Sequence, residues 1–117
     1  LSKMNYVNLI GKMSSEPRFR TLPDGKKVVK FSLVTIEKTL DKKGDFVIKK
    51  DYHLMSAWGR WVKVIEKIKD HNVSIAVEGK ITSRFYFEKG KRKHLNEIEI
   101  NDLLFIENSS YCKKNVA

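Results

Sequence analysis

The feature that most constrains the fold of this chain is the alternation of apolar and polar side chains along most of its length. In residues 28–36, VVKFSLVTI, every second side chain from Val29 to Leu33 is apolar, whereas Lys30 and Ser32 between them are polar. Side chains two residues apart share one face of a strand, so this segment is predicted to be a strand with one face in the core. The same reasoning predicts strands at 4–13, 46–58, 73–88 and 94–106.

One segment has helical spacing instead. In residues 59–72, GRWVKVIEKIKDHN, the apolar residues Trp61, Ile65 and Ile68 recur at i, i+4 and i+7. This spacing predicts one amphipathic helix of about three turns. Asn72 is expected to end it in a left-handed conformation.

Turn-forming residues separate the predicted strands. They are concentrated in three segments: LPDGKK at 22–27, TLDKKGD at 39–45 and EKGK at 88–91. The order of elements is then three strands, a helix and two strands. We therefore predict an all-β, five-stranded OB-fold barrel with one helix between strands 3 and 4. The barrel domain would span residues 4–107, and residues 108–117 would form a flexible C-terminal tail.

The charge balance favours a polyanionic partner. Lys and Arg outnumber Asp and Glu by 24 to 14, a formal net charge of +10. Nucleic acid is the first candidate and an anionic membrane the second, beside the alternative of a merely soluble basic protein. No apolar run approaches the roughly 20 residues of a membrane span, and no signal-peptide pattern opens the chain. With Cys112 as the single cysteine, we expect a cytoplasmic protein without a membrane partner.

Strand parity identifies three aromatic side chains that are candidates for contact with a ligand. Tyr52 and Trp58 share one face of the third predicted strand, and Tyr86 shares its face with Arg84. Exposed rings beside cations suit single-stranded nucleic acid, because unpaired bases stack on aromatic side chains. We predict base stacking at these three rings; packing in the core or at a subunit interface is the alternative for each.

The opposite face of residues 73–88 is predicted to be buried. If no β-bulge shifts the alternation, Phe85 and Phe87 belong to the core. Gly79 is the position at which a bulge could occur.

The turn region from 80 to 94 carries six Lys or Arg residues and one Glu. Such a cluster neutralises phosphates and makes binding weaken as salt rises. The predicted phosphate-binding residues in this turn are Lys89, Lys91, Arg92 and Lys93.

Several short motifs resemble the bacterial single-stranded DNA-binding protein family over residues 4–107. The start NYVNLIG at 5–11 is followed by a Pro17–Arg20 pair, and Tyr52-His53 fills an aromatic–His pair. Further matches are Trp58-Gly59-Arg60 and IAVEG at 75–79.

The resemblance implies base stacking at the same three rings that strand parity selects. It also implies phosphate contacts at Arg84, Arg60 and Lys42. His53 would lie near a subunit interface, because the family generally forms homotetramers; a dimer is possible.

Two departures from the family pattern stand out. Thr39 occupies the place of a frequent tryptophan at the base of the first hairpin, where Leu40 or Phe46 could partly substitute. Family members usually continue into a tail with an acidic, apolar tip that recruits replication and repair proteins. Here SSYCKKNVA is short and basic, so no expectation about such recruitment follows.

We therefore predict sequence-independent binding and protection of single-stranded DNA during replication, recombination and repair. The alternative is an OB-fold accessory module of a primosome or conjugation system that acts mainly through protein partners, and RNA binding also stays open. An enzyme is not expected. Asp51 with His53 and Glu97 with Glu99 lie two residues apart without a third ligand, so no catalytic residue, metal site or cofactor is predicted.

Overall fold

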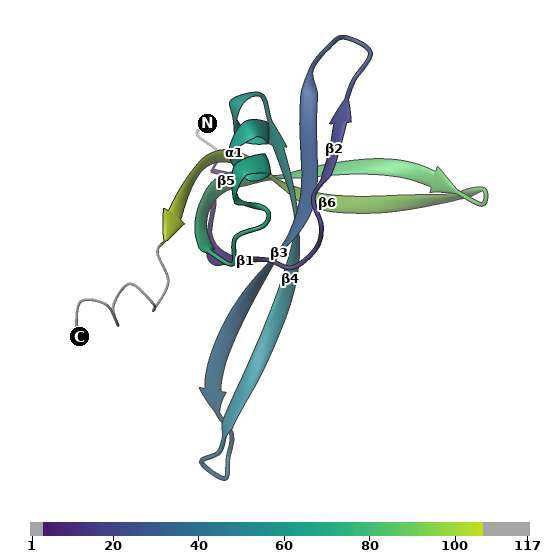
Figure 1. Cartoon of the computed structure of the whole chain (residues 1–117). Helices are drawn as coiled ribbons and strands as arrows, with labels where there is room; N and C mark the ends of the chain where they lie inside the picture. The colour runs from purple at the N-terminus through teal and green to yellow at the C-terminus, as the bar shows by residue number, and fades with distance from the viewer. Residues whose placement is uncertain (1–3, 107–117) are drawn as a thin grey trace, which may run out of the picture.

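The computed structural model describes residues 4–106. Its elements are β1 (Val7–Met13), β2 (Arg18–Thr21), β3 (Lys27–Leu40), β4 (Phe46–Trp58), α1 (Arg60–Ile68), β5 (Ser74–Glu88) and β6 (Lys91–Ile106) (Figure 1). The predicted tail at 108–117 and Cys112 lie outside the described residues.

Five of the strands close into a barrel. The sheet order is β1-β5-β6-β4-β3-β2, and an additional pairing of β1 with β3 closes it. All pairings are antiparallel except that of β4 with β6. This confirms the all-β barrel with one helix. The helix, however, follows the fourth strand and not the third, because the prediction missed the four-residue β2.

The strand β2 was missed because it is short and all of its residues are exposed. Arg18–Thr21 pairs with residues 27–30 of β3, and all four residues of β2 are exposed. A strand without a buried face has no clear alternation to reveal it in the sequence.

The barrel core contains the side chains that the alternation of β3 predicted. Val29, Phe31 and Leu33 are buried. Helix α1 covers one end of the barrel with Val62, Ile65 and Ile68. Burial of this apolar stripe stabilises a helix of nine residues, which would be marginal by itself.

The helix ends earlier than predicted. It stops at Ile68, where the amide of Lys69 donates to the carbonyl oxygen of Ile65 at 2.9 Å. Among the described residues other than glycine, only Lys89 has a positive φ. The expectation of a left-handed Asn72 was therefore wrong.

A β-bulge does lie beside Gly79, but its extra residue is Asn101 of β6, so the alternation of β5 continues unshifted past Gly79. The register between β5 and β6 shifts between Glu78 and Gly79. A Cβ atom at Gly79 would collide with the carbonyl oxygen of Glu99. Only glycine allows this close approach of the two backbones.

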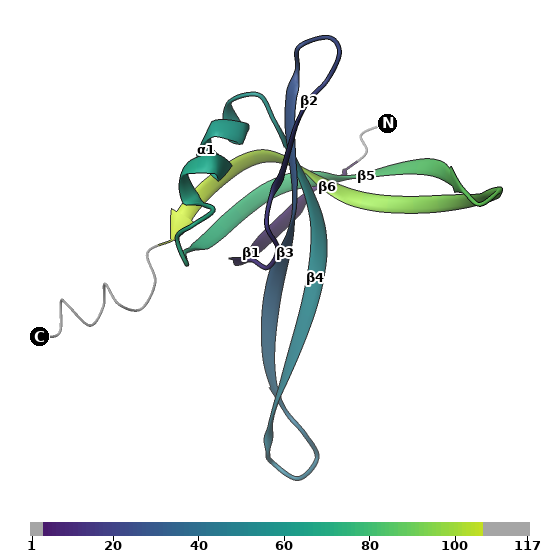
Figure 2. The ribbon, with the colours of Figure 1, turned by 45° about the vertical axis from the view of Figure 1, so that its right-hand side comes forward.

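The prediction that Phe85 and Phe87 are core residues was wrong. Their side chains are 57% and 75% exposed. The hairpin of β5 and β6 extends beyond the barrel as a free arm (Figures 1 and 2). Neither face of this arm is covered within the chain, so alternation does not lead to burial there.

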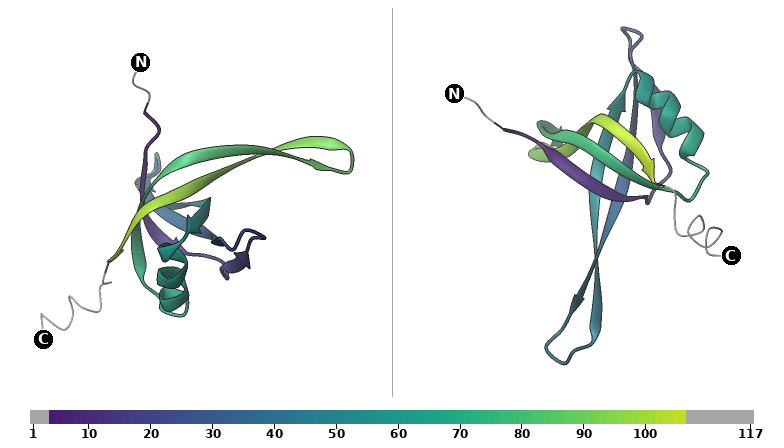
Figure 3. Two further views of the ribbon diagram at one scale, coloured as in Figure 1. Left: turned by 90° about the horizontal axis from the view of Figure 1, so that it is seen from above. Right: turned by 90° about the vertical axis from the view of Figure 1, so that its left-hand side faces the viewer.

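A second arm is formed by β3 and β4. It leaves the barrel in a direction different from that of the β5–β6 arm (Figure 2). The turn of β2 and β3 lies at the opposite end of β3, on the side of α1 (Figure 3). The predicted turns are confirmed; in the third, Lys89 and Gly90 both have positive φ, which is typical of a tight type I′ hairpin.

Candidate nucleic-acid interface

The outward face of β4 carries two of the predicted rings. Tyr52 lies opposite Val34 and Trp58 lies opposite Val28, on the face away from the core. Tyr52 is 64% exposed, whereas Trp58 is half-buried. Six residues of strand separate them, or about 20 Å. The two rings are thus separate platforms along one strand and do not stack on each other.

The third predicted ring lies on the β5–β6 arm. Tyr86 is 41% exposed and lies opposite Lys93, and Arg84 lies opposite Leu95. Cross-strand pairs share a face, so Arg84, Tyr86 and Lys93 point to the same side of the arm. This face combines a ring with two cations, as a base-stacking and phosphate-binding surface requires.

The cations of the arm do not form one cluster. Lys91 and Lys93 share the face of Tyr86, whereas Arg92 lies on the other face, opposite Phe87. The Arg92 guanidinium carbon is 3.8 Å from the centroid of the Phe85 ring. The centroid of the His94 ring is 5.0 Å from that of Phe85. Arg92 is thus held against a ring of its own chain.

Lys42 lies at the tip of the β3–β4 arm. The side chain of Asp41 organises this tip by accepting hydrogen bonds of 2.9 Å from the amides of Lys43 and Asp45. The two arms diverge from the barrel (Figure 1), so the structure does not bring Lys42 together with Lys89–Lys93.

The β3–β4 arm presents a further exposed ring. Phe46 is 70% exposed and lies opposite Leu40, on the same face as Tyr52. The Lys38 ammonium is 4.7 Å from the centroid of its ring. Thr39 points to the other face, since its partner is Val47. Phe46 and Leu40, and not Thr39, therefore continue the face of Tyr52 towards the tip.

Arg60 is the first residue of α1 and follows Trp58 by two positions. Its guanidinium carbon is 4.4 Å from the centroid of the Trp61 ring. This cation–π contact holds the charge near the end of β4.

Two arginines of β2 that were not predicted as site residues lie on the same outward face of the sheet as Trp58. Arg20 of β2 is opposite Val28, whose other neighbour is Trp58. Arg18 is opposite Lys30. In the sequence, only the alternation Arg-Phe-Arg at 18–20 indicates that these arginines share a strand face, and it is too short to identify a strand.

Two of the three acidic side chains of β6 are paired with lysines. Glu97 lies 3.4 Å from Lys30 Nζ, and Glu99 lies 3.4 Å from Lys80 Nζ. These ion pairs reduce the repulsion that two carboxylates on this surface would exert on phosphates.

His53 lies on the inner face of β4 and is partly buried. Its Nε2 atom is 2.9 Å from Thr35 Oγ1. This hydrogen bond lies within one chain, and the predicted subunit interface at His53 stays a prediction.

Across residues 4–106, no three His, Cys, Asp or Glu side chains come close enough together to hold a metal ion. In the same part of the chain, no helix has the length and apolar character to cross a membrane.

The comparison with known proteins points to one family. The model of the "Single-strand binding protein family" matches residues 4–106. Single-stranded DNA-binding protein 1 of Chlorobaculum tepidum is 28% identical over 102 residues, which are 86% of this chain. A single-stranded DNA-binding protein of Neisseria meningitidis is 28% identical over 101 residues. The chain spans only 63% and 58% of the lengths of these two relatives.

Solved structures share the fold. The Plasmodium falciparum SSB in complex with ssDNA is 28% identical, with a TM-score of 0.79, covering 92% of this chain and 98% of that one. The wild-type single-stranded DNA binding protein of Thermus aquaticus has a TM-score of 0.75 at 22% identity. Its match covers 92% of this chain and 52% of that one, and shows the fold alone.

Proposed function

This chain belongs to the single-strand binding protein family, and we propose that it binds single-stranded DNA without reading its sequence. The observation that carries the proposal is the outward face of β4 and of the β5–β6 arm. There, Tyr52 and Tyr86 are exposed and Trp58 is partly exposed, with cations beside them.

The two components of binding have different physical origins. Bases stack on Tyr52, Trp58 and Tyr86, each stack contributing about 1–3 kcal/mol whatever the base. Lysines and arginines hold the phosphates and release condensed counterions on binding. The phosphate contacts we propose are Arg84, Arg60, Lys42, Lys89, Lys91, Arg92 and Lys93.

The positions of these residues imply a bent path for the strand. Because the two arms diverge from the barrel (Figure 2), one strand that reaches Lys42 and Tyr86 must bend around the barrel. Phe46, with Lys38 above its ring, would provide a further stacking platform on the way to Lys42.

The biological role we propose is to coat and protect single strands during replication, recombination and repair. The protein would act as a homotetramer, with a dimer as the smaller alternative, and His53 would lie near the subunit interface. We place it in the cytoplasm with the nucleoid, as a binding protein without catalytic residues, cofactor or metal.

The test is a binding titration with oligo-dT at several salt concentrations. Emission from Trp58 and Trp61 reports binding, since stacking on Trp58 quenches its fluorescence. Matched duplex DNA and oligo-U serve as competitors. We expect tight oligo-dT binding with quenched emission, a steep salt dependence and weak competition by duplex.

The two competitors distinguish the alternatives to this proposal. Equal competition by duplex would show that the charges bind phosphate generically and that the rings are structural, and an accessory module would then be the better description. Equal competition by oligo-U would extend the substrate class to RNA.

A further inference from the structure

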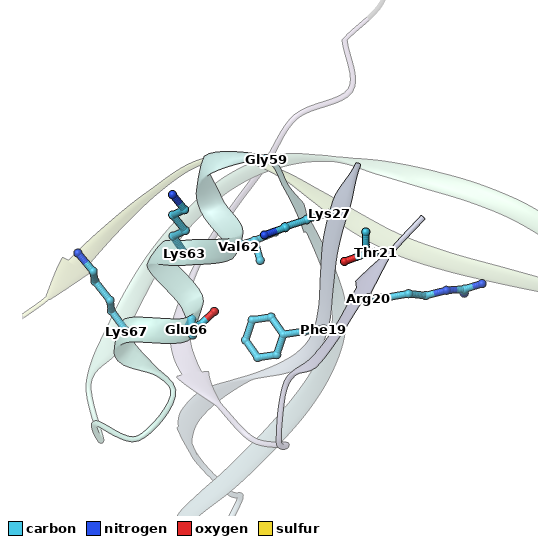
Figure 4. Close-up of a pocket in the computed structure, with 9 residues that line it drawn as sticks. All are labelled: Phe19, Arg20, Thr21, Lys27, Gly59, Val62, Lys63, Glu66 and Lys67. Atoms are coloured by element: carbon cyan, nitrogen blue, oxygen red, sulfur yellow. The ribbon is translucent and has the colours of Figure 1, made fainter. Parts of the chain in front are cut away.

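A groove of about 630 Å³ lies between α1 and the β2–β3 hairpin. Its lining residues come from β2, the start of β3 and the helix: Phe19, Arg20, Thr21, Lys27, Gly59, Val62, Lys63, Glu66 and Lys67 (Figure 4). Its volume lies within the usual range for small-molecule sites. The residues proposed above to bind the strand lie outside this lining.

The β2–β3 hairpin separates this groove from the outward face of β4. Arg20 points away from the helix (Figure 4), on the side of Val28 and Trp58. Phe19 lies opposite Val29, a core residue, and therefore points to the other side, towards α1. The groove is thus a second surface, behind the sheet that carries Trp58.

The charge of the groove is predominantly positive. Lys27, Lys63 and Lys67 are exposed, and the ion pairs found among residues 4–106 involve none of these three. Lys63 and Lys67 are four residues apart, so they project from one face of the helix. Glu66 is the single acidic residue of the lining. Unpaired cations around a cavity favour an anionic occupant.

The floor of the groove is apolar and includes a ring. The Phe19 side chain is 39% exposed and is directed towards Val62 and Glu66 of α1 (Figure 4). The Lys69 ammonium is 5.7 Å from the centroid of the Phe19 ring. A partly exposed ring beside lysines repeats the combination found at Tyr86 on the β5–β6 arm.

One edge of the groove lies at the end of β4, next in the chain to the strand-binding face. Gly59 lines it and directly follows Trp58. The amide of Gly59 donates to the carbonyl oxygen of Lys27 at 3.4 Å, which ties the end of β4 to the hairpin. A strand whose base stacks on Trp58 could therefore reach the groove by passing the end of β4 at Gly59.

We propose that the groove holds a further segment of the same single strand. Phe19 would stack a base or sugar on the floor, and Lys27, Lys63 and Lys67 would contact the phosphates. This inference rests on the proposed function, because it extends that strand beyond Trp58. An acidic peptide is the competing occupant; we favour the strand because Gly59, at the edge of the groove, directly follows Trp58 in the chain.

The experiment compares charge variants over a series of oligo-dT lengths. Lys67→Glu is the test, and Lys26→Glu is its control: Lys26 is exposed, belongs to the same hairpin and pairs with Asp24 at 3.9 Å, outside the groove. Lengths from roughly 4 to 16 nucleotides cover the site sizes of one OB fold. Circular dichroism and the thermal midpoint confirm that each variant is folded.

We expect Lys67→Glu to bind short oligomers as the wild type does. The long oligomers should bind more weakly, and their salt slope should fall by about 0.7 for each phosphate that the variant no longer neutralises. Glu66→Gln should have the opposite effect and strengthen binding of the long oligomers. Phe19→Leu, which keeps an apolar side chain against Val62, should weaken binding of the long oligomers by roughly fivefold or more.

Three results would overturn the inference. One is that Lys67→Glu and Lys26→Glu weaken every length equally, which indicates a general charge effect. Another is that Lys67→Glu leaves the binding of long oligomers unchanged. In that case, an oligo-glutamate peptide ending in phenylalanine that binds the wild type and not Lys67→Glu would identify an acidic peptide as the occupant. Failure of the wild type to bind oligo-dT of any length would refute the proposed function as well, so the two failures are distinguishable.

Discussion

At the scale of single residues, Tyr86 and Phe87 make the most direct comparison. Both rings are exposed and neighbouring, but they point to opposite faces of the β5–β6 arm. Tyr86 shares its face with Arg84 and Lys93, whereas Phe87 lies opposite Arg92. Apart from Arg92, which lies on the other face against Phe85, the proposed contacts in the strands of this arm lie on the face of Tyr86.

We therefore predict that Tyr86→Ala weakens oligo-dT binding by about 1–3 kcal/mol, roughly 5- to 150-fold, at fixed salt. Phe87→Ala should leave the affinity within a factor of about two, because Phe87 is not a proposed contact and its side chain is largely exposed. A fluorescence titration of both variants measures the difference. Equal losses would mean that the strand contacts both faces of the arm, and an unchanged Tyr86→Ala would make Tyr86 a structural residue.

At the scale of elements, the β-bulge opposite Gly79, with its extra residue Asn101 in β6, lies where β5 passes from the barrel into the arm. The register shift between Glu78 and Gly79 leaves the backbone of Gly79 in close contact with that of Glu99. The residues before the shift, such as Ile75 and Val77, are buried, whereas Ile81 beyond it is 48% exposed. The bulge thus marks the boundary between the part of β5 that forms the core and the part that forms the arm.

Gly79→Ala is expected to destabilise the fold by about 1–3 kcal/mol, because the new methyl group must displace the backbone of β6. The free energy of unfolding in urea measures this effect. Asn8→Ala, an exposed position of β1 in the same part of the barrel, should change it by no more than about 0.5 kcal/mol. Equal stability of the two variants would show that β6 can move at Glu99 without cost.

At the scale of the whole molecule, the cations are distributed over two arms and do not form one patch. Lys42 lies at the tip of one arm, and Lys91 and Lys93 lie on the other. A strand of sufficient length can contact both arms only by bending around the barrel. The number of phosphates neutralised should therefore depend on both arms together.

We predict that Lys91→Gln with Lys93→Gln lowers the slope of log affinity against log salt by about 1.4, or about 0.7 for each phosphate left without its lysine. Lys42→Gln should lower the slope by about 0.7 more, and for long oligomers only. Titrations at several salt concentrations measure the slopes. Lys26→Gln, at the turn of the β2–β3 hairpin, is the control that should leave them unchanged.

Local sequence patterns were sufficient for much of the architecture. The alternation around Val29 and Leu33, the helical spacing of Ile65 and Ile68 and the glycine turns depend on neighbours within a few residues. These patterns predicted the barrel, the helix and the outward orientation of the ring at Tyr52. They act at short range, so a single sequence contains them in full.

The tertiary structure decided which strand faces are buried, which local patterns could not show. Alternation tells which side chains of a strand share a face, but burial requires another element to cover that face. The face with the rings of Phe85 and Phe87 is not packed against the barrel because the arm extends past it. Likewise, β2 exists through hydrogen bonds to β3, and Phe19 lines a groove only because α1 packs nearby. The sequence by itself determined five of the six strands, the helix and the faces, whereas long-range packing determined which faces are open to a ligand.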